Sequence, residues 1–242
     1  MPPTWLTVVA WIWIGVGFAS AAVLLFDIFV RGHRQPMGVM EAVYPITALY
    51  FGPVALLLYW RWGRSAAGSG RAKRADSMHH ATPMPGMGMT RARPRWATIA
   101  IEVSHCGGGC VLGDVISEWT IYALAIAVAG ETLFAEYIGD YVLALSFGIV
   151  FQYFAIAPMR GLGLRDGLVA AAKADFISLT CFEIGLFGWM ALMNLVFFPA
   201  PNQLMPNSAA FWFLMQVGMI VGFFTSWPAN VWLLDRGIKV AM

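Results

Sequence analysis

One apolar segment of this chain carries thiol, imidazole and carboxyl groups at helical spacing. It reads EVSHCGGGCVLGDVISEW from residue 102 to residue 119. On an α-helix, side chains four residues apart lie one turn apart on nearly the same face. The residues at this spacing are Glu102, Cys106, Cys110, Asp114 and Glu118. His105 precedes the first cysteine, so the helix presents two thiols, an imidazole and an acid together.

Two thiolates and an imidazole are soft ligands, which favour Cu(I) or Zn(II) over hard cations. A disulfide fits the spacing poorly, because side chains at i and i+4 start roughly 5–6 Å apart whereas bridged Cβ atoms need about 3.8 Å. The glycines Gly107–Gly109 let another helix approach closely or let this helix unwind. We therefore predict a metal site at His105, Cys106 and Cys110. Simple packing of the cysteines, and redox use of the thiols, are the alternatives.

A second candidate site is the segment MHHATPMPGMGM at residues 78–89, which holds four of the fourteen methionines and two of the four histidines. Thioether and imidazole groups together are typical of copper-handling proteins. The predicted ligands are Met78, His79, His80, Met84, Met87 and Met89. The alternative is a low-complexity linker.

Acidic residues also interrupt the apolar segment 168–198, where Asp175 and Glu183 occur. An acid near the centre of a membrane helix costs roughly 2.5–3.5 kcal/mol, so these side chains must face protein or water. Together with Glu102, Asp114 and Glu118, we expect them to act as proton-coupling or polar intramembrane groups. The alternative is that they only cap or pair with helix ends.

The elements that position these groups follow from composition. Of the 242 residues, 60% are hydrophobic and 12% charged, against roughly 25% charged in soluble domains. A membrane helix needs about 20 mainly apolar residues. The expected spans are Thr4 to Val30, Val39 to Trp60, Ala97 to Val128, Ile138 to Pro158, Leu168 to Phe198 and Ala209 to Leu234. The sequence therefore predicts one all-α transmembrane bundle of about six helices over residues 1–242.

Basic residues predict the orientation. Thirteen of the fifteen lie in or beside the second loop, the fourth loop and the C-terminus, and the positive-inside rule puts that side in the cytoplasm. Both termini are then cytoplasmic, and Arg31 and Arg34 lie on the opposite face. Residues 64–95 are expected to form a flexible basic cytoplasmic loop. Its position beside the membrane favours a topology signal over nucleic-acid binding.

Several short segments carry a resemblance. They are YPITALYFGP at 44–53, SHCGGGCVLGD at 104–114, FQYFAIAPMRGL at 151–162, AAKAD at 171–175 and the terminal GIKVAM. They resemble an uncharacterised group of bacterial multi-pass proteins, domain of unknown function 4396, in which the HC-x-x-x-C and GD element is the most specific part. The resemblance implies a helical fold and the bacterial inner (plasma) membrane, and it implies no activity.

These observations predict a membrane protein that binds and moves a soft metal ion, copper being favoured over zinc. No ATP-binding motif occurs, so movement would be driven by an ion or proton gradient rather than by an enzymatic step. A non-catalytic assembly protein, acting as a homo-oligomer or within a larger membrane complex, is one alternative, since eleven tryptophans suit protein contacts. A membrane thiol-redox protein is another; its weakness is that only His105 lies at membrane depth to ligate a haem.

Overall fold

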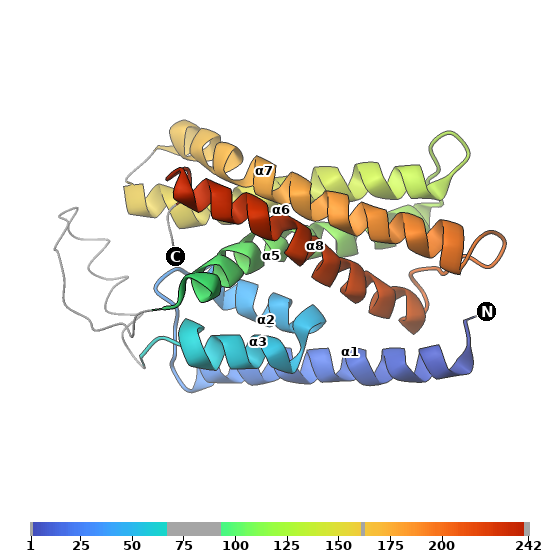
Figure 1. Cartoon of the computed structure of the whole chain (residues 1–242), viewed down its shortest axis with the longest axis horizontal. Helices are drawn as coiled ribbons and strands as arrows, with labels where there is room; N and C mark the ends of the chain where they lie inside the picture. The colour runs from blue at the N-terminus through green and yellow to red at the C-terminus, as the bar shows by residue number, and fades with distance from the viewer. Residues whose placement is uncertain (1, 67–92, 161–162, 240–242) are drawn as a thin grey trace.

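The computed structural model describes residues 2–66, 93–160 and 163–239, and within these ranges the chain is a bundle of helices without a strand (Figure 1). The helices are α1 (Thr4–Leu25), α2 (Met40–Phe51), α3 (Pro53–Leu58), α5 (Arg95–Leu124), α6 (Thr132–Arg160), α7 (Leu164–Leu192) and α8 (Ala209–Asp235). Short π-helical segments continue α1 as η1 (Phe26–Val30), α3 as η2 (Tyr59–Gly63) and α7 as η3 (Met193–Phe197). The predicted all-α bundle is confirmed.

In the described part of the chain, five helices are long and apolar enough to cross a membrane. They are Thr4–Val30, Arg95–Leu124, Thr132–Ala155, Leu164–Phe197 and Ala209–Asp235. Each corresponds to one of the six expected spans. The remaining expected span, Val39 to Trp60, differs from the prediction.

Residues 40–63 form a helical hairpin that turns back inside the bundle. Figure 1 shows α2 running from one end of the molecule toward its middle, and α3 returning to the same end. The turn is at Gly52, whose backbone has φ 55° and ψ −128°, a conformation that favours glycine. Pro53 has no N–H to donate to the Leu49 carbonyl; Gln216 of α8 donates to that carbonyl instead, at 2.8 Å. The segment is long enough to span, but this turn divides it.

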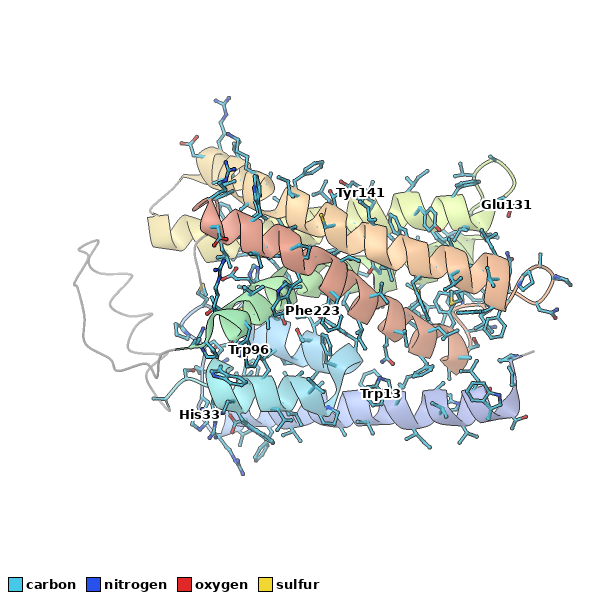
Figure 2. The ribbon with its side chains drawn as sticks, in the orientation of Figure 1. Trp13, His33, Trp96, Glu131, Tyr141 and Phe223 are labelled. Atoms are coloured by element: carbon cyan, nitrogen blue, oxygen red, sulfur yellow. The ribbon has the colours of Figure 1, made fainter. Side chains whose placement is uncertain are left out.

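Five crossings place the two termini at opposite ends of the bundle (Figure 1). Both termini were expected on one face, and the hairpin is the reason for the difference. Because the hairpin returns to the end at which it began, Arg31 and Arg34 lie on the same face as the other basic segments. His33 and Trp96 accordingly lie at one end of the molecule and Glu131 at the other (Figure 2). The positive-inside rule then predicts a cytoplasmic C-terminus and an N-terminus on the opposite face.

Helix α5 is the central helix of the bundle. In its most apolar window 83% of the residues are buried, against 22–50% in the other four long helices. A Cβ atom added at Gly109 would lie 2.8 Å from the Gly148 Cα of α6, and one at Gly113 would clash with the backbone of Ala144. Such small residues at four-residue spacing let membrane helices approach closely. The glycines therefore let α5 pack closely against α6.

Asp27 fastens the hairpin to the end of α1. Its Oδ1 accepts a hydrogen bond from Arg64 Nη2 at 2.6 Å, and its Oδ2 accepts one from Arg64 Nε at 2.9 Å. The Tyr59 hydroxyl donates to Oδ2 at 3.0 Å. The hydrogen bond with Asp27 raises the pKa of Arg64. This contact closes the loop between α1 and the end of the hairpin.

Candidate functional site

Cys106 lies in a buried cluster of polar side chains between α5, α7 and α8. Its Sγ accepts hydrogen bonds from Lys239 Nζ at 2.7 Å and from Ser178 Oγ at 3.2 Å. Asn230 joins the two donors, because its Oδ1 accepts from Lys239 at 2.8 Å and its Nδ2 donates to Ser178 Oγ at 2.7 Å. All four side chains are buried. We call these four residues the lysine–thiol cluster.

Lys239 reaches this cluster because the chain folds back after α8. Gly237 takes a left-handed conformation with φ 66°, and the Ile238 N–H donates to the Leu233 carbonyl at 3.0 Å. The Lys239 side chain then points into the bundle and is 2% exposed. Burial opposes its charge, but the nearby Cys106 and Asp175 outweigh burial and raise the pKa of Lys239. The cluster thus contains a buried ammonium group.

A series of acids continues from the lysine–thiol cluster along the interior of the bundle. It consists of Asp175 and Glu183 on α7, Asp114 and Glu118 on α5, and Asp140 on α6. Each of these side chains is 0–1% exposed. Neither carboxyl oxygen of any of them has a hydrogen-bond partner among the described residues. We call these five residues the acid file.

Electrostatic neighbours show that the acid file is continuous. Asp175 interacts electrostatically with the Cys106 thiol. Among the charged groups, Glu183 has the strongest electrostatic interaction with the next thiol, Cys110. The charged groups acting most strongly on Asp114 are Glu183, Asp140 and Glu118 in that order. Those acting most strongly on Glu118 are Asp140 and Glu136. The file therefore runs from the lysine–thiol cluster to the neighbourhood of Glu136, near the beginning of α6.

The five acids of the file cannot all be ionised without compensation. Removing a carboxylate from water costs several kcal/mol per ion, and neighbouring negative charges repel one another. Lys239 is the cation that reaches the file in the described ranges. Protons or bound cations must therefore neutralise the remaining carboxyl groups. A file of buried acids in this state is suited to holding and passing protons.

The predicted metal ligands separate into different surroundings. His105 faces α6, where its ring centroid lies 6.4 Å from that of Phe151 and where Gln152 is its neighbour. Cys106 faces Lys239, and Cys110 faces Glu183. Among the described residues no three His, Cys, Asp or Glu side chains are placed to hold a metal ion. The described residues therefore do not bring His105 and the two cysteines together as one ligand set. Joint ligation of a metal ion by these three residues stays a prediction.

The other predicted residues are also placed by the structure, except for one segment. Asp114, Glu118 and Glu183 meet in the acid file, and Glu102 is buried near the end of α5 that lies toward Lys239. Asp175 faces Cys106, while the nearby Lys173 is exposed. The predicted ligands Met78, His79, His80, Met84, Met87 and Met89 lie outside the described residues, as does most of the expected loop 64–95.

Sequence reasoning missed two charged residues of the site. Asp140 was not among the predicted site residues, because it lies only two residues after the expected start of the span at Ile138, whereas α6 begins at Thr132. Its burial could have been suspected from the apolar residues on both sides. Lys239 was counted only as a topology signal, and the sequence holds no signal that it folds back onto Cys106.

Comparison with known proteins finds a match to the part of the chain that carries the site. The family model described as Domain of unknown function (DUF4396) matches residues 95–239, more than half of the chain. That range includes α5 to α8, the acid file and Lys239, whereas the segment 44–53 precedes it. No curated protein and no solved structure matches the chain. The chain therefore belongs to the DUF4396 family of uncharacterised domains.

Proposed function

We propose that this protein is a proton-coupled transporter of a soft metal cation in the bacterial inner membrane. The observation that carries the proposal is the acid file, five buried carboxyl groups that continue from the two thiols of α5. Ionisable groups inside a membrane are costly, and they usually mark ion or proton pathways.

Protons are one of the two species that this interior would accommodate. Asp114 has Glu183, Asp140 and Glu118 as its neighbours, so a proton released by one acid has an acceptor nearby. Each transfer would leave the donor carboxyl ionised and the acceptor carboxyl neutral, so the total charge of the file would stay unaltered. Such a series of acids can relay protons between the ends of the bundle.

The two thiols select the other species. Cys106 and Cys110 lie one helical turn apart on α5, and each has a carboxyl neighbour, Asp175 and Glu183 respectively. Thiolates favour Cu(I) and Zn(II), but structural Zn(II) takes four ligands. Two sulfur ligands are sufficient for Cu(I), so copper is the cation that this pair favours. Because the metal binds thiolates, its entry would displace protons toward the neighbouring acids.

Transport in proteoliposomes tests this proposal. The double variant Cys106→Ser/Cys110→Ser should lower the rate of Cu(I) uptake by on the order of tenfold or more, since the hydroxyl is a hard ligand. Ser146→Ala is the matched control, because Ser146 lies exposed on α6 and should leave uptake unchanged. Equal uptake by the double variant and the control would show that the two thiols take no part in copper transport.

A further inference from the structure

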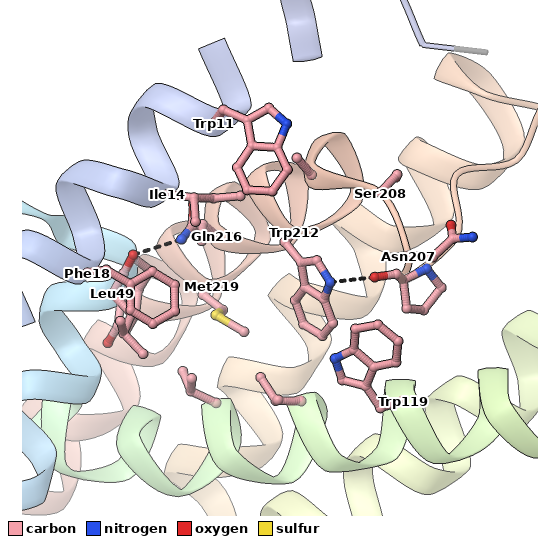
Figure 3. A pocket seen from close by; sticks show the side chains of 15 residues that line it. Trp11, Ile14, Phe18, Leu49, Trp119, Asn207, Ser208, Trp212, Gln216 and Met219 are labelled. Carbon is pink, nitrogen blue, oxygen red and sulfur yellow. Dashed lines mark hydrogen bonds between the residues drawn. The ribbon is translucent and has the colours of Figure 1, made fainter. Parts of the chain in front are cut away.

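The tip of the hairpin meets α5 beside the two thiols. Figure 3 shows how the tip is held, because Gln216 of α8 donates a hydrogen bond to the Leu49 carbonyl at 2.8 Å. The next residue, Tyr50, is fully buried and lies in one apolar cluster with Cys110 of α5 and Phe182 of α7. Backbone that turns at membrane depth is tolerated only where protein or a water-filled cavity surrounds it. The hairpin thus brings Tyr50 from one end of the bundle to its interior.

The Tyr50 hydroxyl lies against α5 between the two cysteines. A Cβ atom added at Gly107 would be 3.2 Å from this hydroxyl oxygen and 3.1 Å from the Phe182 ring. Gly107 directly follows Cys106, and Cys110 comes three residues after it. Both thiols interact electrostatically with the Tyr50 phenol, Cys110 more strongly than Cys106. The glycine therefore leaves the space through which the hydroxyl approaches the thiol pair.

This hydroxyl has a proton to donate. It is buried without a hydrogen-bond partner among the described residues, an arrangement that costs stability. Its polar neighbour on α2 is Thr47, whose own hydroxyl donates to the Val43 carbonyl at 2.9 Å. A phenol keeps its proton at neutral pH. A strong acceptor that appeared beside Gly107 would therefore receive a hydrogen bond from Tyr50.

A soft cation held by both thiols would supply that acceptor. Cu(I) binds thiolates, and an ionised sulfur accepts a stronger hydrogen bond than a neutral oxygen does. Cys106 already has a neutral donor, because the Ser178 hydroxyl donates to its sulfur at 3.2 Å. A neutral donor stabilises the thiolate without repelling the cation, as the Lys239 ammonium group would.

Cys110 needs a neutral donor of the same kind. The charged groups with the strongest effect on Cys110 are acids, Glu183 first. A protonated Glu183 could donate to the sulfur, but in the proposed exchange this acid passes its proton on. The Tyr50 hydroxyl keeps its proton, so it is the donor that stays available to Cys110.

We infer that the Tyr50 hydroxyl donates a hydrogen bond to the Cys110 sulfur when the two thiols hold a soft cation. Tyr50 is then a positioning residue of the cation site, a role that rests on the proposed function. The hairpin acquires a role as well, because its turn at Gly52 ends α2 just after Tyr50 and leaves the tyrosine against α5.

Copper affinity tests this role, measured on the purified protein in detergent under argon by competition with a chromogenic chelator. Tyr50→Phe removes only the hydroxyl and should weaken Cu(I) binding about ten- to hundredfold, as expected for the loss of a hydrogen bond to a charged group. Tyr141→Phe is the matched control, because the Tyr141 hydroxyl contacts Thr180 instead. This control should bind Cu(I) like the parent protein.

A second pair of variants tests the placement of the hydroxyl. The added Cβ of Gly107→Ala would press on Tyr50, so this variant should weaken Cu(I) binding about three- to tenfold. A Cβ at Gly108 would instead meet the Val43 side chain at 3.3 Å. Gly108→Ala is thus similarly crowded, and it should keep the affinity of the parent protein.

Infrared difference spectra between the copper-loaded and the empty protein show whether the hydroxyl itself takes part. The C–O–H band of one tyrosine should shift on loading, because its hydroxyl gains an acceptor. Tyr50→Phe should lose this shift, and Tyr141→Phe should keep it. Equal Cu(I) affinities within either pair of variants, or a tyrosine shift that persists in Tyr50→Phe, would overturn the role of Tyr50 and leave the copper proposal standing. A parent protein that binds no Cu(I) would overturn the proposed function, and the role of Tyr50 with it.

Discussion

Lys239 places a positive charge where a cation in the proposed pathway would bind. Its ammonium group contacts the Cys106 sulfur at 2.7 Å and the Asn230 oxygen at 2.8 Å. Both atoms are electron donors that a metal cation would also use. The lysine therefore competes with the cargo for this end of the acid file.

Replacing Lys239 should accordingly strengthen metal binding. In the variant Lys239→Met, we expect the apparent affinity for Cu(I), measured by competition with a chromogenic chelator, to rise on the order of tenfold, because one unit of repulsive charge is removed. Arg236→Met is the control, since Arg236 lies three residues earlier on an exposed turn. An identical affinity in both variants would show that Lys239 does not compete.

Part of this site was visible in the sequence. The four-residue spacing of Cys106, Cys110 and Asp114 predicted one shared face, and these side chains do line the interior of the bundle. Contacts made across the fold were not visible. Lys239 and Cys106 are 133 residues apart, and nothing local to either residue indicates that they meet.

At the scale of the helices, the approach of α5 to α6 positions the acid file. Gly113→Ala should lower the free energy of unfolding by about 1–3 kcal/mol, because its Cβ would clash with the backbone of Ala144. A Cβ at Gly15 on α1 would meet nothing within 4 Å, so Gly15→Ala should stay within about 0.5 kcal/mol of the parent. Thermal unfolding in detergent measures both. Equal midpoints for the two variants would contradict the proposed close packing.

The hairpin depends on its connection to α1. Arg64→Met leaves the Asp27 carboxylate, 3% exposed, without its two hydrogen bonds from Arg64. We expect a loss of about 1–2 kcal/mol, reduced by the partial exposure of Arg64. Arg31 contacts Asp27 only at 3.7 Å and is 61% exposed, so Arg31→Met should change the unfolding midpoint much less. The opposite ranking would mean that Arg31 is the main partner.

Composition and length were sufficient to predict the long helices, because a run of about 20 apolar residues has few other stable forms. The same rule failed for residues 39–60. Their length and hydropathy suit a span, and Pro53 alone indicates only a bend. The reversal also requires the left-handed turn at Gly52 and the Gln216 side chain of a distant helix, which a single sequence does not reveal.

For the whole molecule, the hairpin determines the topology. A reporter that is active only in the cytoplasm should be active when fused after Met242 and silent when fused before Met1, because five spans separate the two ends. An externally active reporter should give the reverse pattern. Cytoplasmic activity at both ends would support the six-span arrangement predicted from the sequence. It would show that residues 40–63 cross the membrane rather than turn back.

Direct observation of coupled fluxes tests the central claim, that the acid file exchanges protons for a soft cation. Proteoliposomes containing a pH-sensitive dye are held at fixed membrane potential with potassium and valinomycin, and an inward Cu(I) gradient is imposed. Metal binding to the thiols displaces protons, so the lumen should become alkaline as copper enters. Asp114→Asn should reduce this pH change, whereas the control Ser146→Ala should keep it. Copper entry without any change in luminal pH, or no entry at all, would contradict the account.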